Sequence, residues 1–318
     1  MISPAISIII PNYNKGAFIS ATIESILHNS FKNWELVIID DGSTDHSLQI
    51  IEQFVRNDNR IKLIKQANQG GAQARNVGLD TIQAPYFMFV DADDFISPFC
   101  LESRLKKAEE FNEFDGWIFP MQPFRDGHPE ERMSTWRPPE DQLLAGLIGH
   151  ELSWSTVSPL WRTQAIKGKF KFNPRYHRLQ DVQFHTEIVL SGIPLKTFPK
   201  VPADCYYRLI ADSKSSKDMF ILKWISSCEM YVQEYTPQVD DALKKKILKT
   251  FMRCLETAGH YYRRRQINEN AFNQAIAIAL RNMPSRYTKV CIQVYRQVLK
   301  LPFHVRGAYR VFSFLLTL

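Results

Sequence analysis

The sequence predicts an α/β fold in which a mainly parallel sheet is covered by helices on both faces. Short, β-branched apolar runs alternate with amphipathic helical patterns between residues 6 and 91, which is typical of consecutive βαβ units. Polar clusters also follow three of the predicted strands, as "PNYN", "DDGSTD" and "DADD". Because ligands of such sheets bind beyond the carboxyl ends of the strands, these clusters predict a binding site at one sheet edge.

The elements follow in order from the spacing of the apolar residues. The first strands are predicted at 6–10, 34–40, 61–66 and 86–91, with helices at 17–30, 43–55 and 70–82. A helix at 98–111, a strand at 116–121, a loop at 125–141, a helix after 176 and a strand at 203–210 come next. Helices are then predicted at 219–235, 241–265 and 269–282. The change from alternating strands and helices to helices alone predicts an α/β domain at 1–218 and a helical region at 219–318.

Composition places the chain among ordinary globular proteins. It has 318 residues, of which 45% are hydrophobic and 23% charged, so we expect one large or two modest domains and no global disorder. The net charge of +7 fits an anionic partner, such as a nucleotide, a nucleic acid or a membrane, or simply a slightly basic surface.

Cysteine usage and hydropathy bear on the compartment. The five cysteines are scattered and form no C-x-x-C pair, which fits a reducing compartment. The first apolar run lacks a basic flank and stops at Pro11, which predicts a strand and not a signal peptide. No apolar stretch reaches the ~20 residues of a membrane span. We therefore expect a cytoplasmic protein, or one that touches the membrane from its cytoplasmic face.

Two of the polar clusters are suited to a nucleotide. Asp40 and Asp41 precede Gly42, which permits a tight turn, and a carboxylate at a strand end accepts a hydrogen bond from a ligand N–H. Simple N-capping of the next helix is the alternative. In "NQGGAQARNVGL", the two glycines allow a ligand to approach the backbone and Arg75 can reach a phosphate, although a turn with a surface arginine is equally consistent. The spacing matches neither G-x-G-x-x-G nor a P-loop.

The cluster "DADD" is the most informative. Asp91 and Asp93 are two positions apart, so both can turn toward one ligand. Carboxylates select Mg²⁺ or Mn²⁺, and Mg²⁺ completes its shell with water and substrate phosphates. An acidic turn with Asp94 as a helix cap is the alternative, but clustered carboxylates beside a buried strand are unfavourable without a cation. We therefore predict a divalent metal that arrives with a diphosphate.

Together the three blocks resemble a known family. "SIIIPNYNKGAFISATIESILHNSFKNWELVIIDDGSTDHS", "NQGGAQARNVGL" and "FMFVDADDF", in this order and spacing, are similar to family 2 glycosyltransferases of the GT-A fold. They cover about residues 5–100. The resemblance implies a GT-A fold and an inverting transfer from a nucleotide sugar, with uridine diphosphate as the carrier, in bacterial surface-polysaccharide synthesis (capsule, lipopolysaccharide or O-antigen).

The resemblance also implies residue roles. Asp93 is the closer ligand of Mn²⁺ or Mg²⁺, and Asp91 contacts the metal or the ribose. Arg208 lies on a segment that folds over the phosphates. The residues implied to bind the donor are Pro11, Tyr13, Asp40, Asp41, Asn68, Arg75, Asp91, Ala92 and Arg208.

The catalytic base of the family usually comes from an "ED" pair at the start of a later helix. The best match is "LQDVQFHTEI", which puts Asp181 in the aspartate position and Gln180 where glutamate is common. Glu187 is the fallback. In the implied mechanism Asp181 takes the proton of the acceptor hydroxyl as it attacks the anomeric carbon, and the configuration inverts.

The C-terminal region lies outside these motifs. Residues 288–318 interleave Lys and Arg with apolar residues, which favours peripheral contact with an anionic inner membrane and with lipid-linked glycan acceptors. A packed helical subdomain or a homo-oligomer contact is the alternative. No Q-x-x-R-W follows Asp181. In this family that pattern marks processive polymerases, so we expect single addition to a glycan or lipid-linked glycan.

Two other function classes compete. A nucleotidyltransferase that makes nucleotide sugars also uses acidic metal sites, but it expects a Gly-rich basic loop after the first strand, and "PNYNKG" is not one. A non-catalytic sugar- or nucleic-acid-binding module is compatible with the basic charge. Nucleic-acid binding, however, requires a basic stripe with stacking aromatics, whereas the predicted strand ends are acidic, so no nucleic-acid partner is expected.

Overall fold

The structure, a computed structural model, describes residues 3–140, 143–148, 155–209, 217–283 and 286–299. The chain divides into two compact units. The first comprises residues 1–144, 152–174 and 180–211, and the second comprises 145–151, 175–179 and 212–318. The last division falls at 211/212, near the 218/219 boundary that the sequence predicts, and two short earlier segments belong to the second unit.

The first unit is built around a seven-stranded sheet. In spatial order its strands are β10 (Leu195–Thr197), β6 (Gly116–Ile118), β9 (Pro159–Arg162), β4 (Tyr86–Phe89), β1 (Ile6–Asn12), β2 (Trp34–Asp40) and β3 (Ile61–Lys65). All neighbours are parallel except β9, which runs antiparallel to β4 and β6. The expectation of a mainly parallel sheet is therefore confirmed.

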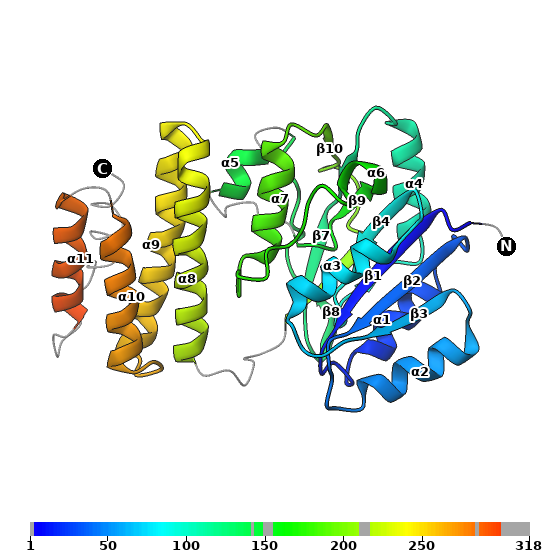
Figure 1. Ribbon diagram of the computed structural model, residues 1–318, viewed down its shortest axis with the longest axis horizontal. Coiled ribbons are helices and arrows are strands. Elements are labelled where there is room, and N and C mark those ends of the chain that lie inside the picture. The colour runs from blue at the N-terminus through cyan, green and yellow to red at the C-terminus, as the bar shows by residue number, and fades with distance from the viewer. Residues whose placement is uncertain (1–2, 141–142, 149–154, 210–216, 284–285, 300–318) are drawn as a thin grey trace. The chain divides into compact units, whose positions relative to one another are not determined.

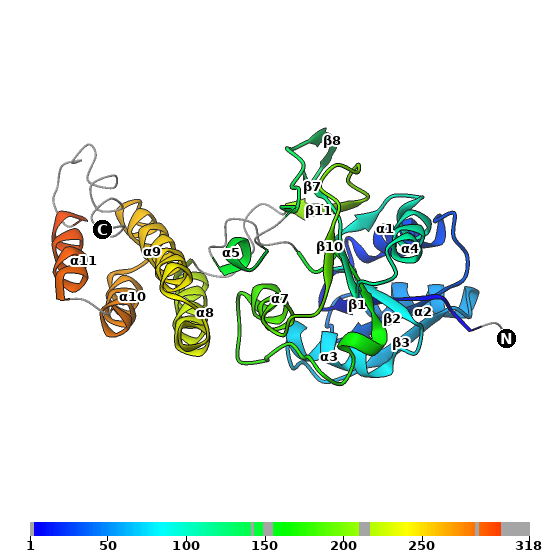
Figure 2. The same cartoon turned by 90° about the horizontal axis from the view of Figure 1, so that it is seen from above.

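Helices cover both faces of this sheet (Figures 1 and 2). One face packs against α1 (Ile19–Leu27), α2 (Ser47–Asn57) and α4 (Cys100–Glu110), and the other against α3 (Gly71–Thr81), α6 (Thr163–Ile166) and α7 (Gln180–Leu190). Strand β1 shows why apolar residues follow one another without alternation between residues 8 and 10. Ile8 and Ile10 are fully buried on the first face, and Ile9 is fully buried on the second.

A four-stranded sheet completes the first unit, in the order β5 (Phe95–Ile96), β11 (Cys205–Leu209), β7 (Met121–Arg125) and β8 (His128–Arg132). The sequence predicts a loop at 125–141, and this is wrong for the first part of the segment, because β7 and β8 form an antiparallel hairpin. Gly127 lies between the two strands with a φ of 78°, a conformation that glycine adopts without strain.

The register of the central strands brings the polar clusters to one edge of the large sheet. Asn12 pairs with Asp40 at the ends of β1 and β2, and Ile9 pairs with Phe89 at the end of β4. Because these three strands are parallel, the segments that follow them leave the sheet at the same edge. The fold thus assembles residues that are far apart in the sequence.

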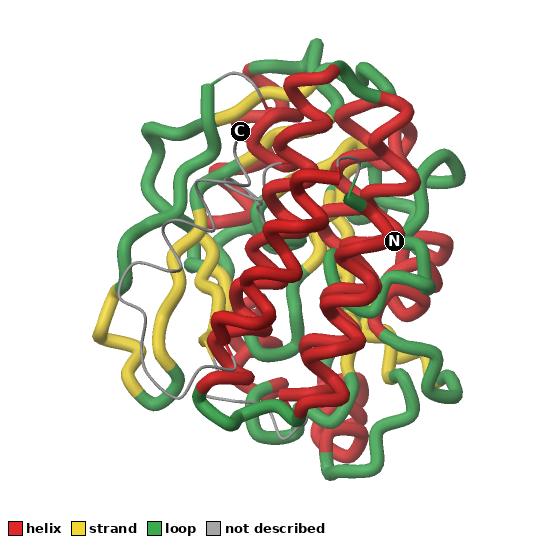
Figure 3. The backbone as a smooth tube through the Cα atoms, turned by 90° about the vertical axis from the view of Figure 1, so that its left-hand side faces the viewer, coloured by secondary structure: helices red, strands yellow, loops and turns green. Residues whose placement is uncertain are grey.

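The described elements of the second unit are helical. They are α8 (Lys217–Tyr235), a 3₁₀ turn (Thr236–Gln238), α9 (Asp241–Arg263), α10 (Glu269–Asn282) and α11 (Arg286–Leu299), and α5 (Leu143–Ile148) has residues in both units. The long helices of this unit run side by side (Figures 1 and 3). In the part of the chain that the structure describes, no helix is both long and apolar enough to cross a membrane.

Candidate active site

A pocket of about 290 Å³ opens at the carboxyl edge of the central strands, within the first unit. It is lined by Pro11, Asn12, Tyr13, Lys15, Asp41, Gly71, Ala74, Arg75, Asp91, Ala92, Asp93, Tyr207 and Arg208. Most of the residues that the resemblance assigns to the donor or the metal are in this set. Asp40, Asn68 and Asp181 are not.

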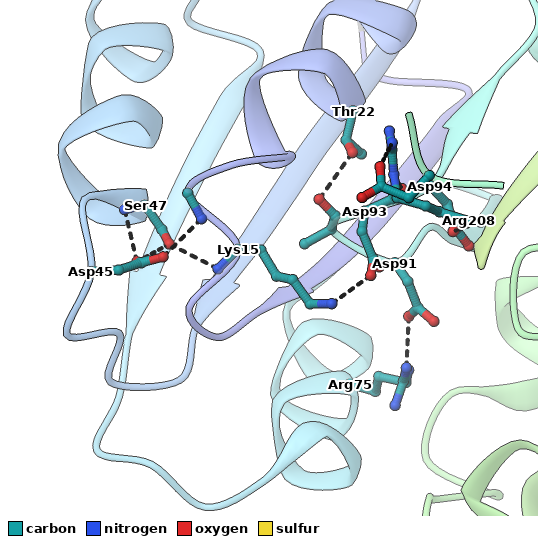
Figure 4. A network of polar contacts seen from close by, with 12 residues as sticks. Lys15, Thr22, Asp45, Ser47, Arg75, Asp91, Asp93, Asp94 and Arg208 are labelled. Carbon is teal, nitrogen blue, oxygen red and sulfur yellow. Dashed lines mark hydrogen bonds and ion pairs between the residues drawn. The ribbon is translucent and has the colours of Figure 1, made fainter. Parts of the chain in front are cut away.

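Asp91 and Asp93 reach the pocket from the turn after β4, and each carries one ion pair. Arg75 Nη2 lies 2.6 Å from Asp91 Oδ1. Lys15 Nζ pairs with Asp93 Oδ2. Figure 4 shows the two cations approaching the turn from different segments. The two carboxylates repel each other at this spacing, and their cationic partners offset that repulsion.

Asp94 holds the same turn to the small sheet. It is 1% exposed, and its Oδ1 accepts the backbone N–H of Arg208 at 2.9 Å. Burial, and then the charge of Asp91, raises the pKa of Asp94 well above its ordinary range. The capping role considered for Asp94 is not realised, because Phe99 is the N-cap residue of α4.

Arg208 binds the turn with its side chain as well. Its Nε donates to the carbonyl of Asp93 at 2.8 Å, and its Nη1 donates to Asp126 Oδ1 at 2.8 Å. The guanidinium also lies over Phe18 and Phe124, 4.8 Å and 4.7 Å from the ring centroids. Arg208 therefore lines the pocket and at the same time positions the backbone that carries Asp93.

Asp40 stabilises the end of β2. Its carboxylate accepts Asn12 Nδ2 at 2.8 Å and the backbone N–H of Ser43 at 3.1 Å. Gly42 follows with a φ of 75°, and an added Cβ would lie 2.9 Å from the backbone nitrogen of Asn68. The turn therefore requires glycine for its conformation and for the close approach.

Asp41 organises the loop after β3. Its carboxylate accepts Gln66 Nε2 at 2.6 Å and the backbone N–H groups of Gln69 and Gly70 at 2.8 Å each. Asn68 contacts the same residue, because its Nδ2 donates to the carbonyl of Asp41 at 3.0 Å. Asp41 is 2% exposed and still lines the pocket. The nucleotide contacts expected of Asp41 and Asn68 stay predictions.

Asp181 lies in the first turn of α7, beside Gln180. Arg75 links this helix start to the acidic turn, because its Nη1 donates to Gln180 Oε1 at 3.1 Å while its Nη2 contacts Asp91. Burial raises the pKa of Asp181, although the N–H of Val182 and the charge of Arg75 lower it in part. A carboxyl group with a raised pKa close to a charged cluster is suited to proton transfer.

Comparison with known proteins identifies the segment that contributes most of the pocket lining. Residues 7–153 match the sequence model described as "Glycosyl transferase family 2". This segment, a little under half of the chain, is similar to that family.

Proteins named as glycosyltransferases match parts of the chain. An uncharacterized glycosyltransferase of Haemophilus influenzae is 48% identical over 103 residues, which are 32% of this chain and 41% of that protein. The uncharacterized glycosyltransferase YibD of Escherichia coli is 38% identical over 208 residues, which are 59% of this chain and 57% of that protein. The chain thus spans less than two thirds of the length of either relative.

A solved structure of the same fold covers nearly the whole chain. Residues 1–349 of TarS from Staphylococcus aureus, crystallised with UDP-GlcNAc, share 20% identity and give a TM-score of 0.67. The match covers 98% of this chain and 90% of that chain. At this identity the likeness shows the fold alone, and it confirms the expected GT-A architecture.

The resemblance to family 2 glycosyltransferases implies a divalent metal at Asp91 and Asp93, and the residues present fit one. Among the described residues, Asp91 Oδ2 and Asp93 Oδ1 take no hydrogen bond, so each carboxylate has a free oxygen. No group of three or more His, Cys, Asp or Glu in the described segments is arranged to hold a metal alone. Two carboxylates suit a hard cation that brings phosphate and water ligands. Three buried atoms around the pocket without protein partners, Asn12 Oδ1, Arg75 Nε and Asp94 Oδ2, also fit a polar ligand.

Four side chains of the pocket were not expected from the sequence: Asn12, Lys15, Ala74 and Tyr207. For Lys15 the signal is present, because "PNYNKG" places a cation just beyond the first strand. Tyr207 lies in the middle of β11, and its sequence neighbours do not indicate which side of the strand faces the pocket. Burial, and then the charges of Asp94 and Asp91, raises the pKa of Tyr207 to about 12.

Proposed function

We propose that this chain is a metal-dependent, inverting glycosyltransferase that moves one sugar from a nucleotide-diphosphate sugar to a hydroxyl of a glycan. The observation that carries the proposal is the bridge made by Arg75. One guanidinium contacts Asp91 at the candidate metal site and Gln180, the neighbour of the candidate base Asp181. One side chain therefore links the candidate metal site to the helix start that carries the candidate base.

A uridine diphosphate sugar is the proposed donor. TarS, which shares the fold, was solved with UDP-GlcNAc. In this chain Pro11, Tyr13 and Asp41 line one pocket with the acidic turn. The ring of Tyr13 is 47% exposed and therefore available to stack on a base. Asn68 and Asp40 would act by holding Asp41 and its neighbours in place.

The chemistry divides between the metal and Asp181. Bound by Asp93 and Asp91, Mn²⁺ or Mg²⁺ would stabilise the charge that develops on the leaving nucleoside diphosphate. Asp181 in its ionised form accepts the proton of the acceptor hydroxyl while that oxygen attacks the anomeric carbon. The bond to the diphosphate breaks in the same displacement, so an α-linked donor gives a β-linked product.

The proposal extends to the acceptor and its location. The acceptor class is a bacterial surface glycan or its lipid-linked precursor, reached at the cytoplasmic face of the inner membrane. Val290 and Val294 on α11 are 54% and 56% exposed, which supports a peripheral membrane or homo-oligomer contact by this helix. Residues 300–318, the rest of the basic-apolar tail, lie outside the described residues.

Donor hydrolysis tests the function. The purified chain is incubated with a panel of UDP and GDP sugars, with Mn²⁺ or with a chelator, and release of the nucleoside diphosphate is followed. We expect release from a UDP sugar that depends on the metal. A nucleotidyltransferase would instead form pyrophosphate from a sugar 1-phosphate and a nucleoside triphosphate. Binding of a nucleotide sugar without turnover, even with a panel of glycan acceptors present, would point to a binding module.

A further inference from the structure

Lys15 lines the pocket, yet the proposed mechanism gives it no role. Its ammonium pairs with Asp93, and the two side chains are 32% and 14% exposed. Asp93 is also the carboxylate expected to bind the metal most closely. A lysine and a divalent metal therefore compete for one group, and the structure shows the lysine bound to it (Figure 4).

The backbone at Lys15 is fixed by the start of α2. The N–H of Lys15 donates to Ser47 Oγ at 3.0 Å. The N–H of Gly16 donates to Asp45 Oδ2 at 2.9 Å. A Cβ on Gly16 would lie 2.8 Å from the ring of His46, so the turn and the helix are in close contact. Because the main chain is held at these points, only the side chain of Lys15 is left to change partner.

Arg75 and Lys15 differ in how they are held. Arg75 donates to both Gln180 and Asp91, and its side chain is only 13% exposed. In the described part of the chain, the ammonium of Lys15 has Asp93 as its single hydrogen-bond partner. A lysine is a compact charge on a flexible stem, whereas an arginine bound through two nitrogens has a fixed orientation. The arginine is thus the fixed cation of the pocket and the lysine the exchangeable one.

We propose that Lys15 occupies Asp93 while the pocket is empty and transfers to the diphosphate of the donor when a divalent metal takes Asp93. The inference rests on the proposed function, which supplies the diphosphate and the metal. A divalent metal and an ammonium on the same carboxylate repel each other even when they bind different oxygens, so metal binding displaces the ammonium. The displaced ammonium then lies beside a phosphate, to which it donates a charge-assisted hydrogen bond.

The transfer of Lys15 from Asp93 to the diphosphate couples metal binding to nucleotide binding. In the free protein Lys15 weakens metal binding, because the metal has to displace it. In the complex Lys15 strengthens nucleotide binding, so metal and nucleotide bind cooperatively. Removing the ammonium therefore raises one affinity and lowers the other. General damage to the pocket would lower both.

Lys15→Met tests this exchange, because methionine keeps an unbranched apolar stem beside Phe18. Mn²⁺ binding without nucleotide is measured by electron paramagnetic resonance, and UDP binding at saturating Mn²⁺ by calorimetry. We expect the variant to bind Mn²⁺ about fivefold more tightly and UDP about tenfold more weakly, the effect of one lost charge-assisted hydrogen bond. Lys171→Met is the matched control: it removes a lysine paired with Asp80 at 3.0 Å outside the pocket, and both affinities should equal those of the wild type.

The outcomes separate this inference from the proposed function. An unchanged Mn²⁺ affinity, an unchanged UDP affinity or a fall in both affinities in Lys15→Met overturns the exchange. Lys15→Arg keeps the charge and should bind UDP within about threefold of the wild type, and a tenfold loss there also contradicts the inference. If the wild type binds neither UDP nor GDP in the presence of Mn²⁺, the proposed function fails and the exchange fails with it.

Discussion

Two pairs of aspartates lie at the ends of β2 and β4, the strands on either side of β1 in the large sheet, and the structure holds them in different ways. Asp40 and Asp41, after β2, are almost fully buried and bind backbone N–H groups and side-chain amides. Asp91 and Asp93, after β4, are partly exposed to the pocket and are paired with the cations Arg75 and Lys15. The two clusters are alike in composition and differ in the chemistry of their partners.

This difference indicates what each pair can do. A carboxylate that satisfies backbone N–H groups cannot release them without leaving buried donors unpaired. A carboxylate paired with a side-chain cation can accept another cation in its place. We therefore expect Asp41 to act mainly on stability and Asp93 on metal and donor binding, with the proton transfer assigned to a third place, Asp181.

We expect the largest effect on turnover at Asp181, the proposed base. Asp181→Asn keeps the size of the side chain and removes the base, so turnover should fall about 1,000-fold while UDP affinity is retained. Steady-state kinetics and calorimetry measure the two quantities. Near wild-type turnover would exclude Asp181 as the base. Glu187→Gln tests the fallback base on the same helix: Glu187 accepts Gln183 Nε2 at 2.7 Å, and its loss should leave turnover near that of the wild type if Asp181 is the base.

The protonation of Asp181 adds a pH dependence. Because burial raises its pKa, the active ionised form is lost as the pH falls through a value above that of an ordinary aspartate. The acidic limb of kcat/KM should therefore lie above about pH 4. A limb at or below that pH would contradict the raised pKa.

Asp93→Ala should have the next largest effect. Loss of a metal ligand is expected to lower turnover about 100-fold and to remove the response to added Mn²⁺, while the midpoint of thermal unfolding changes little. Activity is titrated with Mn²⁺ and with chelator in both proteins. Asp126→Ala is a useful control, because it removes an acidic partner of Arg208 outside the pocket lining. A variant at position 93 that still loses activity on chelation would contradict the metal assignment.

In contrast to Asp93→Ala, Asp41→Ala should lower the stability of the fold more than the affinity for Mn²⁺. The change leaves Gln66 and the N–H groups of Gln69 and Gly70 without their acceptor. We expect the free energy of unfolding to fall by about 2 kcal/mol, measured by urea denaturation, with Mn²⁺ affinity nearly unchanged. If the variant is as stable as the wild type and only nucleotide binding is lost, Asp41 is a ligand contact and the contrast between the two pairs is wrong.

The sequence predicts the strands and the acidic clusters of this site well, but it does not predict the ion pairs between its side chains. The strands β1 and β2 are mostly apolar, and parallel pairing then places "DDGS" and "DADD" at one edge. Which cation reaches which carboxylate depends on side-chain directions, so the pairing of Lys15 with Asp93 does not follow from periodicity. The sequence predicts a loop over β8 because proline and charge are frequent there, whereas β8 pairs with β7, which also pairs with β11.

Glu35 on β2 combines the two kinds of partner, because it binds both a neutral donor and a cation. We expect the smallest effect at this residue. Glu35 is 6% exposed and accepts one neutral donor, Ser7 Oγ at 2.6 Å, and one cation, Lys62 Nζ at 2.7 Å. Burial alone would raise its pKa, but the hydrogen bonds from Lys62 and Ser7 outweigh burial and lower it. The resulting stabilisation is complete above the unfolded pKa of about 4.3 and is lost as the pH falls through the lower folded pKa.

Because Lys62 is largely exposed, Lys62→Met should cost only about 0.5 kcal/mol at pH 7, and the difference in urea midpoint from the wild type should shrink toward pH 3. A difference that grows in acid would mean that the lysine does not lower the pKa of Glu35.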